Sequence, residues 1–262
     1  MKLSNLLTIS VVSHGHGQLL ERLIRQLNNE ESLRGIRLVV TLNKPQEVFS
    51  YEHKSASNLN IITLRNGVPI GFGANHNQAF KYCKTKWFAI LNPDLLLPND
   101  VFSPLIQAAE ERCASLVVPH IVNPLGHTED SIRLNLTPWS LIKRLLKVAS
   151  QPPIKQKRFS WFAGMFYLVD SSAYREIGGF DERFFLYCED YDFCARLFLD
   201  GYTAFFHADV LVVHDARRSS RKSTPYFLKH LKSMLKVWSS SIVWRISFIN
   251  IFDRNRLINW CK

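Results

Sequence analysis

The sequence predicts an α/β protein built on a mainly parallel, Rossmann-like sheet. Short apolar runs alternate along the chain with segments of helical periodicity, and the runs are apolar throughout rather than at every second residue. Strands of that kind are typical of a parallel sheet that helices cover on both faces. No Gly-x-Gly-x-x-Gly follows the first run, which argues against a dinucleotide-dependent dehydrogenase.

The elements are expected in a regular order along the chain. The first strand is predicted at residues 9–12, and apolar residues at helical spacing predict a helix over residues 19–27. Further strands are expected at residues 36–42, 59–64, 87–91, 115–119, 159–169 and 203–213, and further helices at residues 74–83, 101–112, 139–148, 171–177 and 190–199. In such sheets ligands bind beyond the carboxyl ends of the strands, so the loops at residues 13, 43 and 92–94 should line one crevice.

The net charge of +11 is unevenly distributed along the chain. Residues 131–169 hold seven basic and no acidic residues, and residues 214–262 hold eleven basic and two acidic ones. The rest of the chain carries a net charge of −5. Two basic segments beside an acidic body indicate an anionic partner, which is a phosphate, a lipid surface or a nucleic acid; solubilising surface charge is the alternative.

Cysteine usage and the N-terminus indicate the compartment. Five cysteines without C-x-x-C spacing argue against a disulfide framework or a zinc site. The first apolar run is short and is followed by Ser13-His14-Gly15-His16 rather than a small-residue cleavage site, which favours a strand over a signal peptide. No apolar stretch reaches the ~18 residues of a membrane span. We therefore expect a cytoplasmic protein with reduced thiols.

Two strand ends carry groups suited to a metal and phosphate. Asn92-Pro93-Asp94 follows a strand, and a carboxylate in that position suits Mg²⁺ that also binds phosphate oxygens; a plain turn is the alternative. His214 ends another strand shortly before the basic pair headed by Arg217. That arrangement suits a metal or a phosphate, whereas a lone histidine is more often structural.

Three carboxylates crowd the start of the helix predicted at residues 190–199. They are Glu189, Asp190 and Asp192, and aromatic residues precede them. A carboxylate against an apolar wall has a raised pKa, as a general base requires. One or two of the three could instead serve as helix caps.

The motifs, taken in order, resemble those of family-two glycosyltransferases with the GT-A fold. Among these the sequence is most similar to bacterial rhamnosyltransferases of O-antigen and cell-wall assembly. The resemblance covers about residues 7–220. The matching motifs are Ser10-Val-Val-Ser-His-Gly-His, Gly71-Phe-Gly-Ala-Asn-His-Asn, Asn92-Pro-Asp, Gly164, Gly179-Phe-Asp-Glu-x-Phe-Phe-x-Tyr-x-Glu-Asp-x-Asp and His214.

This resemblance implies a role for each candidate residue. Asp190 matches the general base, with Glu189 beside it. The resemblance assigns donor binding to Ser13, Asn43, Gly71, Asn77, Asn92 and Arg217, the Mg²⁺ or Mn²⁺ ion to Asp94 and His214, and acceptor binding to Trp161 and Gly164. The ring of Trp161 would stack on a sugar if exposed; a core aromatic is the alternative.

Two family acids are replaced in this sequence. Leu42-Asn43 stands where many members have Asp-Asn, whose Asp contacts the pyrimidine base, so Asn43 and backbone groups are expected to recognise the base. Asn92 stands in place of the first metal-binding Asp. An inactive, degenerate transferase is therefore one alternative, although Asp94, Glu189 and Asp190 remain.

The resemblance implies an inverting transferase that moves a sugar, rhamnose by preference, from a nucleoside-diphosphate donor such as dTDP-rhamnose. The acceptor would be a polyprenyl-diphosphate-linked saccharide of O-antigen or another surface polysaccharide, reached at the inner face of the cytoplasmic membrane. Other functions are a nucleotidyltransferase or pyrophosphatase in the same metal crevice, and a basic nucleic-acid-binding protein. No nucleic-acid recognition motif is present, so a nucleic-acid partner is not expected.

The expected organisation is a GT-A catalytic domain at residues 1–221 and a basic amphipathic helical tail at residues 222–262. The apolar face of the tail holds Phe227, Leu228, Leu231, Met234, Leu235, Trp238 and Ile242. A basic helix with tryptophan on its apolar face is typical of a membrane-surface element. Packing of that face on the catalytic domain is the alternative, and both can hold.

Overall fold

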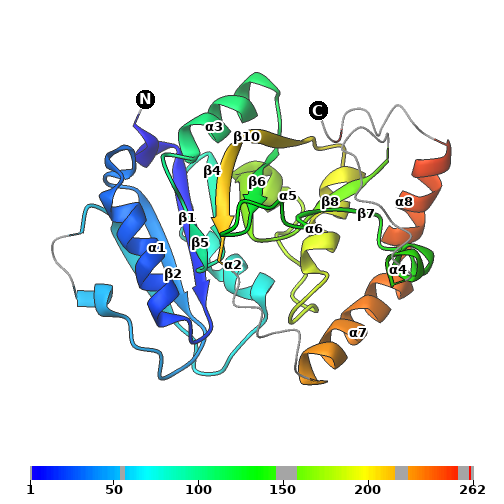
Figure 1. Cartoon of the computed structure of the whole chain (residues 1–262), viewed down its shortest axis with the longest axis horizontal. Coiled ribbons are helices and arrows are strands. Elements are labelled where there is room, and N and C mark those ends of the chain that lie inside the picture. Colours follow the sequence, from blue (N-terminus) through cyan, green and yellow to red (C-terminus); the bar gives the residue numbers. More distant parts are fainter. Residues whose placement is uncertain (1, 54–56, 146–157, 216–223, 253–259, 261–262) are drawn as a thin grey trace.

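A computed structural model of the chain describes residues 2–53, 57–145, 158–215, 224–252 and 260 (Figure 1). The large sheet is made of β1 (Leu7–Ser13), β2 (Arg37–Leu42), β3 (Asn60–Arg65), β4 (Trp87–Leu91), β5 (Leu95–Leu96), β6 (Leu116–Val122), β9 (Phe166–Asp170) and β10 (Ala204–His214). The spatial order is β3-β2-β1-β4-β9-β6-β10-β5. Only β9 and β5 run antiparallel to their neighbours, so the prediction of a mainly parallel sheet is confirmed.

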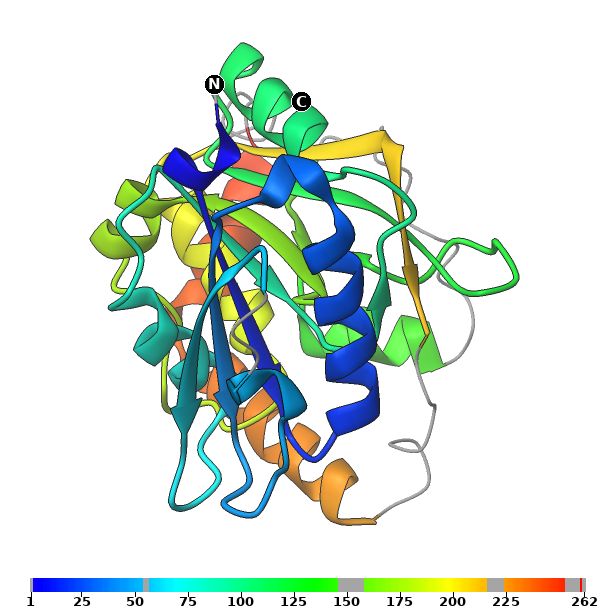
Figure 2. The ribbon, with the colours of Figure 1, turned by 90° about the vertical axis from the view of Figure 1, so that its left-hand side faces the viewer.

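Helices cover both faces of this sheet. On one face lie α1 (Gly17–Asn29) and α3 (Phe102–Glu111), whose apolar stripes pack in one core with β1 and β6 (Figure 2). On the other face lie α2 (Phe72–Phe80), α5 (Ser171–Glu176) and α6 (Glu189–Leu199), in a second core rich in aromatic rings. Short 3₁₀ helices occupy Leu3–Asn5, Glu31–Leu33 and Ser50–His53.

The strand predicted at residues 159–169 is two strands in two sheets. Its first part, β8 (Ser160–Phe162), pairs with β7 (Ile132–Leu134) in a separate two-stranded sheet. Its second part is β9, which lies between β4 and β6 in the large sheet. The prediction of one continuous strand is wrong because the chain turns at residues 163–165, and Gly164 lies in that turn. This turn contacts both Asn92 and Asp190, two residues of the candidate site.

The C-terminal helices α7 (Thr224–Ser239) and α8 (Ser241–Phe252) pack on the catalytic domain. Met234, Val237, Val243 and Ile246 are buried in the same core as α6. Trp260 is also buried there, and its indole N–H donates to the Ser160 carbonyl at 2.6 Å. Of the two expectations for the tail, packing on the domain is what these contacts show.

Two expected helical segments extend beyond the described residues. The helix predicted at residues 139–148 is α4 (Pro138–Leu145), and its last three residues fall outside the described part. The side chains of Phe227 and Leu228 also lie outside it. In the part of the chain that is described, no helix combines the length and apolar character needed to cross a bilayer.

Candidate active site

The sheet brings the expected loops together at one edge. Ser13 ends β1, Asn43 follows β2, Asn92 follows β4 and His214 ends β10. All four strands run parallel, so their carboxyl ends point the same way and the residues that follow lie at the same edge of the sheet, where the sequence analysis expects a crevice.

Asp94 and His214 meet in this crevice. Nε2 of His214 lies 3.3 Å from Oδ2 of Asp94, and Nδ1 lies 2.7 Å from Oε2 of Glu129. Burial lowers the pKa of His214, but the two carboxylates outweigh it and raise the pKa to about 8. Burial raises the pKa of Asp94, but the hydrogen bond and charge of His214 bring it below its usual range.

Glu129 is a site residue that sequence reasoning missed. It lies in the loop after β6, another parallel strand whose carboxyl end faces the crevice. The rule applied to the loops at residues 13, 43 and 92–94 therefore pointed to this loop as well. In the structure its carboxylate orients the His214 ring from behind, which leaves Nε2 directed at Asp94.

A divalent cation fits Asp94. Its Oδ1 is buried and has no hydrogen-bond partner among the described residues, although a buried polar atom is normally satisfied. Across the described ranges, no group of three or more His, Cys, Asp or Glu side chains is arranged as a closed metal site. A site with one free carboxylate oxygen suits an ion that takes its other ligands from a diphosphate and water, and His214 would join as a ligand on losing its Nε2 proton.

Asp190 lies at the start of α6, on the other side of the turn at residues 163–165. Its Oδ2 accepts the Gly164 N–H at 3.3 Å, and its Oδ1 accepts the Tyr191 N–H at 2.9 Å. Burial raises the pKa of Asp190, and the charge of Arg133 offsets part of the rise. Burial and the neighbouring Asp190 raise the pKa of Glu189 well above its usual value. A raised carboxyl pKa is what a general base at neutral pH needs.

The turn at residues 163–165 joins the two halves of the site. Met165, beside Gly164, accepts the backbone N–H of Asn92 at 2.9 Å. Gly164 in turn donates to Asp190. A Cβ at Gly164 would meet the Asp190 side chain at 3.5 Å, so the backbone passes close beside the carboxylate. The Asp94 loop and the Asp190 carboxylate are thus fixed relative to one another.

A strained backbone precedes the carboxylates. Tyr187 and Cys188 have φ angles of 71° and 68°, a left-handed conformation that costs non-glycine residues about 1–2 kcal/mol each. Helix α7 holds this segment in place. Ser233 donates to the Leu186 carbonyl at 3.0 Å, and the His230 ring packs edge-on against Tyr187 at 5.0 Å. Contacts from α7 therefore offset the strain in the backbone next to Asp190.

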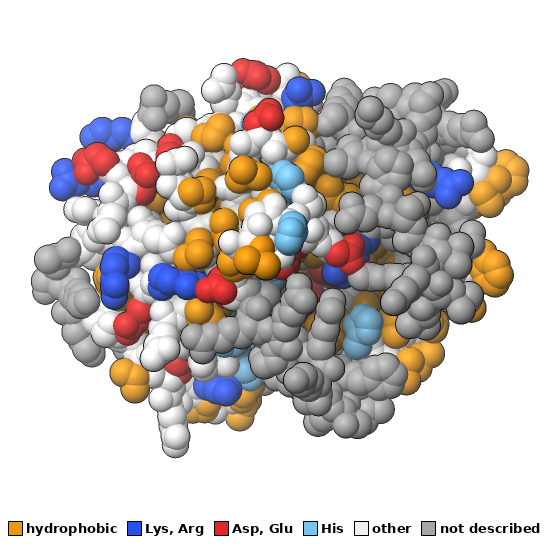
Figure 3. Space-filling view, in the orientation of Figure 1, with side chains coloured by type: hydrophobic (Ala, Val, Ile, Leu, Met, Phe, Trp, Pro, Cys, Tyr) orange, Lys and Arg blue, Asp and Glu red, His pale blue; other side chains and the backbone are white. Residues whose placement is uncertain are grey.

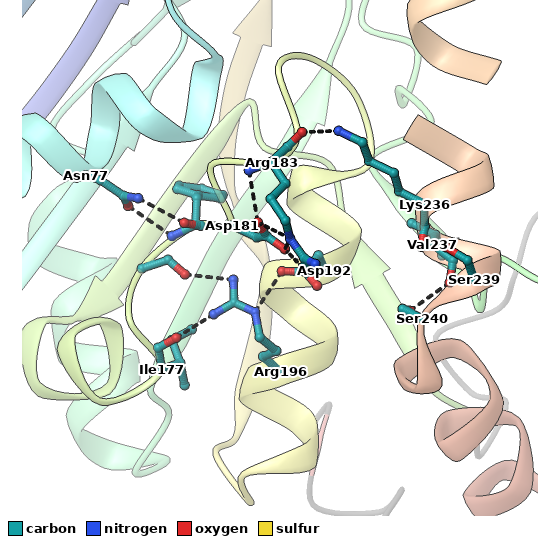
Figure 4. A network of polar contacts seen from close by, with 12 residues as sticks. Asn77, Ile177, Asp181, Arg183, Asp192, Arg196, Lys236, Val237, Ser239 and Ser240 are labelled. Carbon is teal, nitrogen blue, oxygen red and sulfur yellow. Dashed lines mark hydrogen bonds and ion pairs between the residues drawn. The ribbon is translucent and has the colours of Figure 1, made fainter. Parts of the chain in front are cut away.

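Arg196 and Asn77 hold the preceding loop, which spans residues 177–183 (Figure 4). The guanidinium of Arg196 pairs with Asp192 at 2.7 Å and donates to the Ile177 and Gly179 carbonyls. The Asn77 amide donates to the Phe180 carbonyl at 2.9 Å and accepts its N–H at 2.9 Å. Asn77, expected in the donor pocket, thus binds the loop that leads to Asp190.

Ser13 is bound to a carboxylate that the sequence analysis did not single out. The Ser13 hydroxyl donates to Oε1 of Glu47, a buried residue in the loop after β2. Glu47 also accepts the N–H groups of Gly15 at 2.9 Å and His16 at 3.1 Å. One carboxylate therefore fixes the loop at the end of β1. An acidic residue four positions after Asn43, at the same edge of the sheet, was the signal available.

Asn43 takes part in a network of side-chain amides. Its Oδ1 accepts from the Asn66 amide at 2.8 Å and the Ile70 N–H at 3.0 Å, and its Nδ2 donates to the Ile70 carbonyl at 2.9 Å. Asn66 also donates to Asn75 at 2.7 Å. This network holds the segment that leads to Gly71, the N-cap of α2.

Gly71, Trp161 and Arg217 complete the set of expected residues. A Cβ at Gly71 would come within 2.8 Å of the Phe184 carbonyl oxygen, so only glycine lets α2 approach the loop that holds Phe184 this closely.

Trp161 is only 4% exposed, and its indole N–H donates to the Leu134 carbonyl at 2.9 Å. Of the two alternatives for Trp161, the structure shows the core aromatic residue. The ring is not exposed for stacking on a sugar. Arg217 lies outside the described residues.

Replacing Glu47 by alanine is expected to weaken nucleoside-diphosphate binding about tenfold, measured by calorimetry, because the Gly15 and His16 N–H groups lose their acceptor. Glu47→Gln keeps one acceptor oxygen and should recover part of the affinity. Glu21→Ala is the matched control, because the Glu21 carboxylate accepts the exposed Ser50 hydroxyl and neither the Gly15 nor the His16 N–H group. Unchanged affinity in Glu47→Ala would show that the loop does not touch the nucleotide.

The fold of the large sheet and its covering helices is that of a GT-A glycosyltransferase. The chain belongs to glycosyl transferase family 2, whose sequence profile matches residues 8–175. Family membership confirms the predicted fold and enzyme class.

Two curated relatives at moderate identity are rhamnosyltransferases, and another, 26% identical over 190 residues, is a pre-mycofactocin glycosyltransferase of Mycobacterium tuberculosis. The chain is 28% identical over 247 residues to the rhamnosyltransferase WbbL of Escherichia coli (strain K12), covering 87% of this chain and 90% of that protein. It is 25% identical over 205 residues to the N-acetylglucosaminyl-diphospho-decaprenol L-rhamnosyltransferase of Mycobacterium tuberculosis (strain CDC 1551 / Oshkosh), covering 66% of this chain and 65% of that protein.

Solved structures of other glycosyltransferases share the fold. A mannosyltransferase from Pyrobaculum calidifontis, in complex with GDP-Man and Mn²⁺, superposes with a TM-score of 0.64 at 14% identity, covering 97% of this chain and 72% of that one. Residues 1–349 of S. aureus TarS, in complex with UDP-GlcNAc, give a TM-score of 0.60 at 12% identity, covering 95% and 74%.

Proposed function

We propose that this chain is an inverting rhamnosyltransferase that uses a nucleoside-diphosphate donor, with dTDP-rhamnose as the leading candidate. The observation that carries the proposal is the pairing of two groups across one turn. Asp190 stands as a base with a raised pKa on one side, and Asp94 with an unsatisfied oxygen stands on the other. The choice of rhamnose is supported by the names of the two curated relatives.

The proposed reaction is a single displacement. Asp190 takes the proton of an acceptor hydroxyl as that oxygen forms a bond to the anomeric carbon of the sugar. The bond between that carbon and the diphosphate oxygen breaks on the opposite face, and the nucleoside diphosphate leaves. The Gly164 and Tyr191 N–H groups hold the Asp190 carboxylate in place for this transfer.

Asp94 and His214 would hold a Mg²⁺ or Mn²⁺ ion, with Asn92 beside them. When bound, the ion neutralises the negative charge that develops on the departing diphosphate. The chain's own part is to supply Asp94 Oδ1, a buried oxygen without a hydrogen-bond partner among the described residues, and to fix the His214 ring through Glu129. Ser13, with the loop that Glu47 holds, is proposed to contact the nucleoside.

We propose a polyprenyl-diphosphate-linked saccharide as acceptor, in the synthesis of O-antigen or another surface polysaccharide. Support comes from the relative whose name specifies a decaprenol-linked substrate. A lipid-linked acceptor would put the reaction at the inner face of the cytoplasmic membrane, where the protein would be peripheral. The basic segments of the chain suit the diphosphate of such an acceptor.

A thermal-shift screen of dTDP-rhamnose, UDP-sugars and GDP-sugars with Mn²⁺ tests the donor. At a concentration about 100 times the dissociation constant, a ligand stabilises the fold by about 2.7 kcal/mol, which raises Tm by on the order of 5 °C. We expect this shift with dTDP-rhamnose. A shift only with UDP- or GDP-sugars would overturn the rhamnosyl assignment and leave the transferase class intact.

A further inference from the structure

Helix α8 is apolar on both sides although it lies at the surface. Its inner side buries Val243 and Ile246 in the core around α6. Its outer side carries Trp244, Phe248, Ile251 and Phe252, which are between 52 and 68% exposed. The spacing of four, three and one residues puts these side chains on one stripe. A surface helix normally turns a polar face outward, so this stripe points to a partner.

A second exposed apolar element lies at the same end of the molecule. Trp139 and Ile142 of α4 are 64 and 44% exposed. Two contacts tie α4 to the α7–α8 corner. The Asn135 amide donates to Ser247 of α8 at 3.0 Å, and the Trp238 indole donates to the Leu136 carbonyl at 3.0 Å. Figure 1 shows α4 beside α8 at this end.

We call these six residues (Trp139, Ile142, Trp244, Phe248, Ile251 and Phe252) the α4–α8 apolar face. Figure 3 shows apolar side chains projecting at the right-hand edge, over α8, with a basic side chain beside them. Two of the six are tryptophans, the residue type enriched where a protein meets the headgroup region of a bilayer.

The described helices around this face are basic. Residues 224–252, which make up α7 and α8, contain Lys229, Lys232, Lys236 and Arg245 and no Asp or Glu, although Asp253 follows Phe252 in the sequence. Residues 138–145, which make up α4, also lack acidic residues. Lys229 and Lys236 lie against Phe185 and the Arg183 carbonyl, whereas Arg245 is exposed directly beside Trp244. An apolar stripe on predominantly basic helices is complementary to an anionic membrane surface.

We propose that the α4–α8 apolar face docks on an anionic lipid bilayer, with α8 lying in the plane of the interface. The apolar face expected on α7 is partly exposed, because Leu231 and Leu235 are 37 and 54% exposed whereas Met234 is buried. The exposed stripe on α8 adds residues that the sequence analysis did not name. Helix α7, about 24 Å long, then connects the docked end to the loop before Asp190.

Vesicle flotation tests this proposal on the full-length chain. The triple variant Phe248→Ser, Ile251→Ser and Phe252→Ser removes three exposed side chains and leaves the buried side of α8 intact. We expect the unaltered protein to float with vesicles of phosphatidylcholine and phosphatidylglycerol. The triple variant should bind them at least tenfold more weakly, because its contacts with the acyl region are lost.

The matched control is the double variant Val68→Ser and Leu125→Ser. It removes two apolar side chains outside the α4–α8 apolar face, which are 70 and 80% exposed. It should float like the unaltered protein. The unaltered protein should bind vesicles of phosphatidylcholine alone more weakly, because these vesicles lack the negative charge that attracts the basic residues. Near-ultraviolet circular dichroism confirms that the triple variant is folded.

Two outcomes would overturn the proposal. One is equal flotation of the triple variant and the unaltered protein. The other is no flotation at all together with a dimer in light scattering that the triple variant abolishes, which would assign the face to a second copy of the chain. Vesicle binding needs neither donor nor acceptor, so its failure is distinguishable from a failure of the proposed transferase reaction.

Discussion

Asp190→Asn is expected to fold normally and to lose kcat by a factor of about 10²–10⁴. Asparagine is nearly the same size and cannot take a proton, and its single oxygen keeps one of the two hydrogen bonds that the carboxylate accepts from the Gly164 and Tyr191 N–H groups. Initial rates of sugar transfer measure the loss, and Tm measures the fold. Retained turnover would remove Asp190 from the role of base.

The matched control lies on the same helix. Asp192 is also a buried carboxylate whose burial raises its pKa, but it is paired with Arg196 and holds the loop rather than a substrate. Asp192→Asn should lower Tm and leave kcat within a few-fold of the unaltered enzyme. If both variants lose turnover equally, the effect comes from the structure of α6 and not from proton transfer.

The same assignment fixes the sign of the pH dependence. A base acts when deprotonated, and burial raises the pKa of Asp190. Activity should therefore fall, as pH decreases, at a higher pH than an ordinary aspartate near 3.9 would give. The acid limb of the pH–rate profile measures this.

Asp94→Asn is expected to abolish the metal-dependent part of nucleoside-diphosphate binding. Loss of a residue that only supports a metal ligand already costs about 10–100-fold, so loss of the carboxylate itself should cost at least as much. Calorimetry with the nucleoside diphosphate, with and without Mn²⁺, measures the difference. In the unaltered protein Mn²⁺ should tighten binding; in the variant it should have no effect.

Asp215 provides the control for this change. It is the residue after His214, and its carboxylate pairs with Arg22 at 2.8 Å in a partly exposed position. Exposed ion pairs contribute little to stability, so the affinity of Asp215→Asn for the nucleotide should be within about threefold of that of the unaltered protein. An equal loss in both variants would indicate a general charge effect, and full Mn²⁺ dependence in Asp94→Asn would contradict the assignment.

Strands and helices were predictable from sequence because each depends on local periodicity. The apolar runs predict the parallel strands, and the polar residues after them predict the crevice. The place of β9 was not predictable, because the pairing of Leu168 with Ala89 and Val117 depends on contacts far apart in the chain. Periodicity near Gly164 also gives no sign that the chain changes sheets there.

Within the site, motif order assigned Asp94 and His214 to one metal, Asp190 to the base and Gly164 to the acceptor, and these roles stay predictions. It did not pair Asp190 with Gly164, although the structure brings together both Asp94 with His214 and Asp190 with Gly164. It missed Glu47 and Glu129, which act through long-range hydrogen bonds to other loops. It also could not tell whether Trp161 faces solvent, because an aromatic residue in a strand can face either way.

The position of α7 and α8 has a consequence for the order in which the chain folds. During synthesis the residues up to His214 emerge first and carry every group of the proposed chemistry. The strained turn at Tyr187 and Cys188 still lacks its support from Ser233, and the core around α6 still lacks Trp260. We therefore expect the backbone before Asp190 to gain its full support only after α7 has been synthesised and has packed against it.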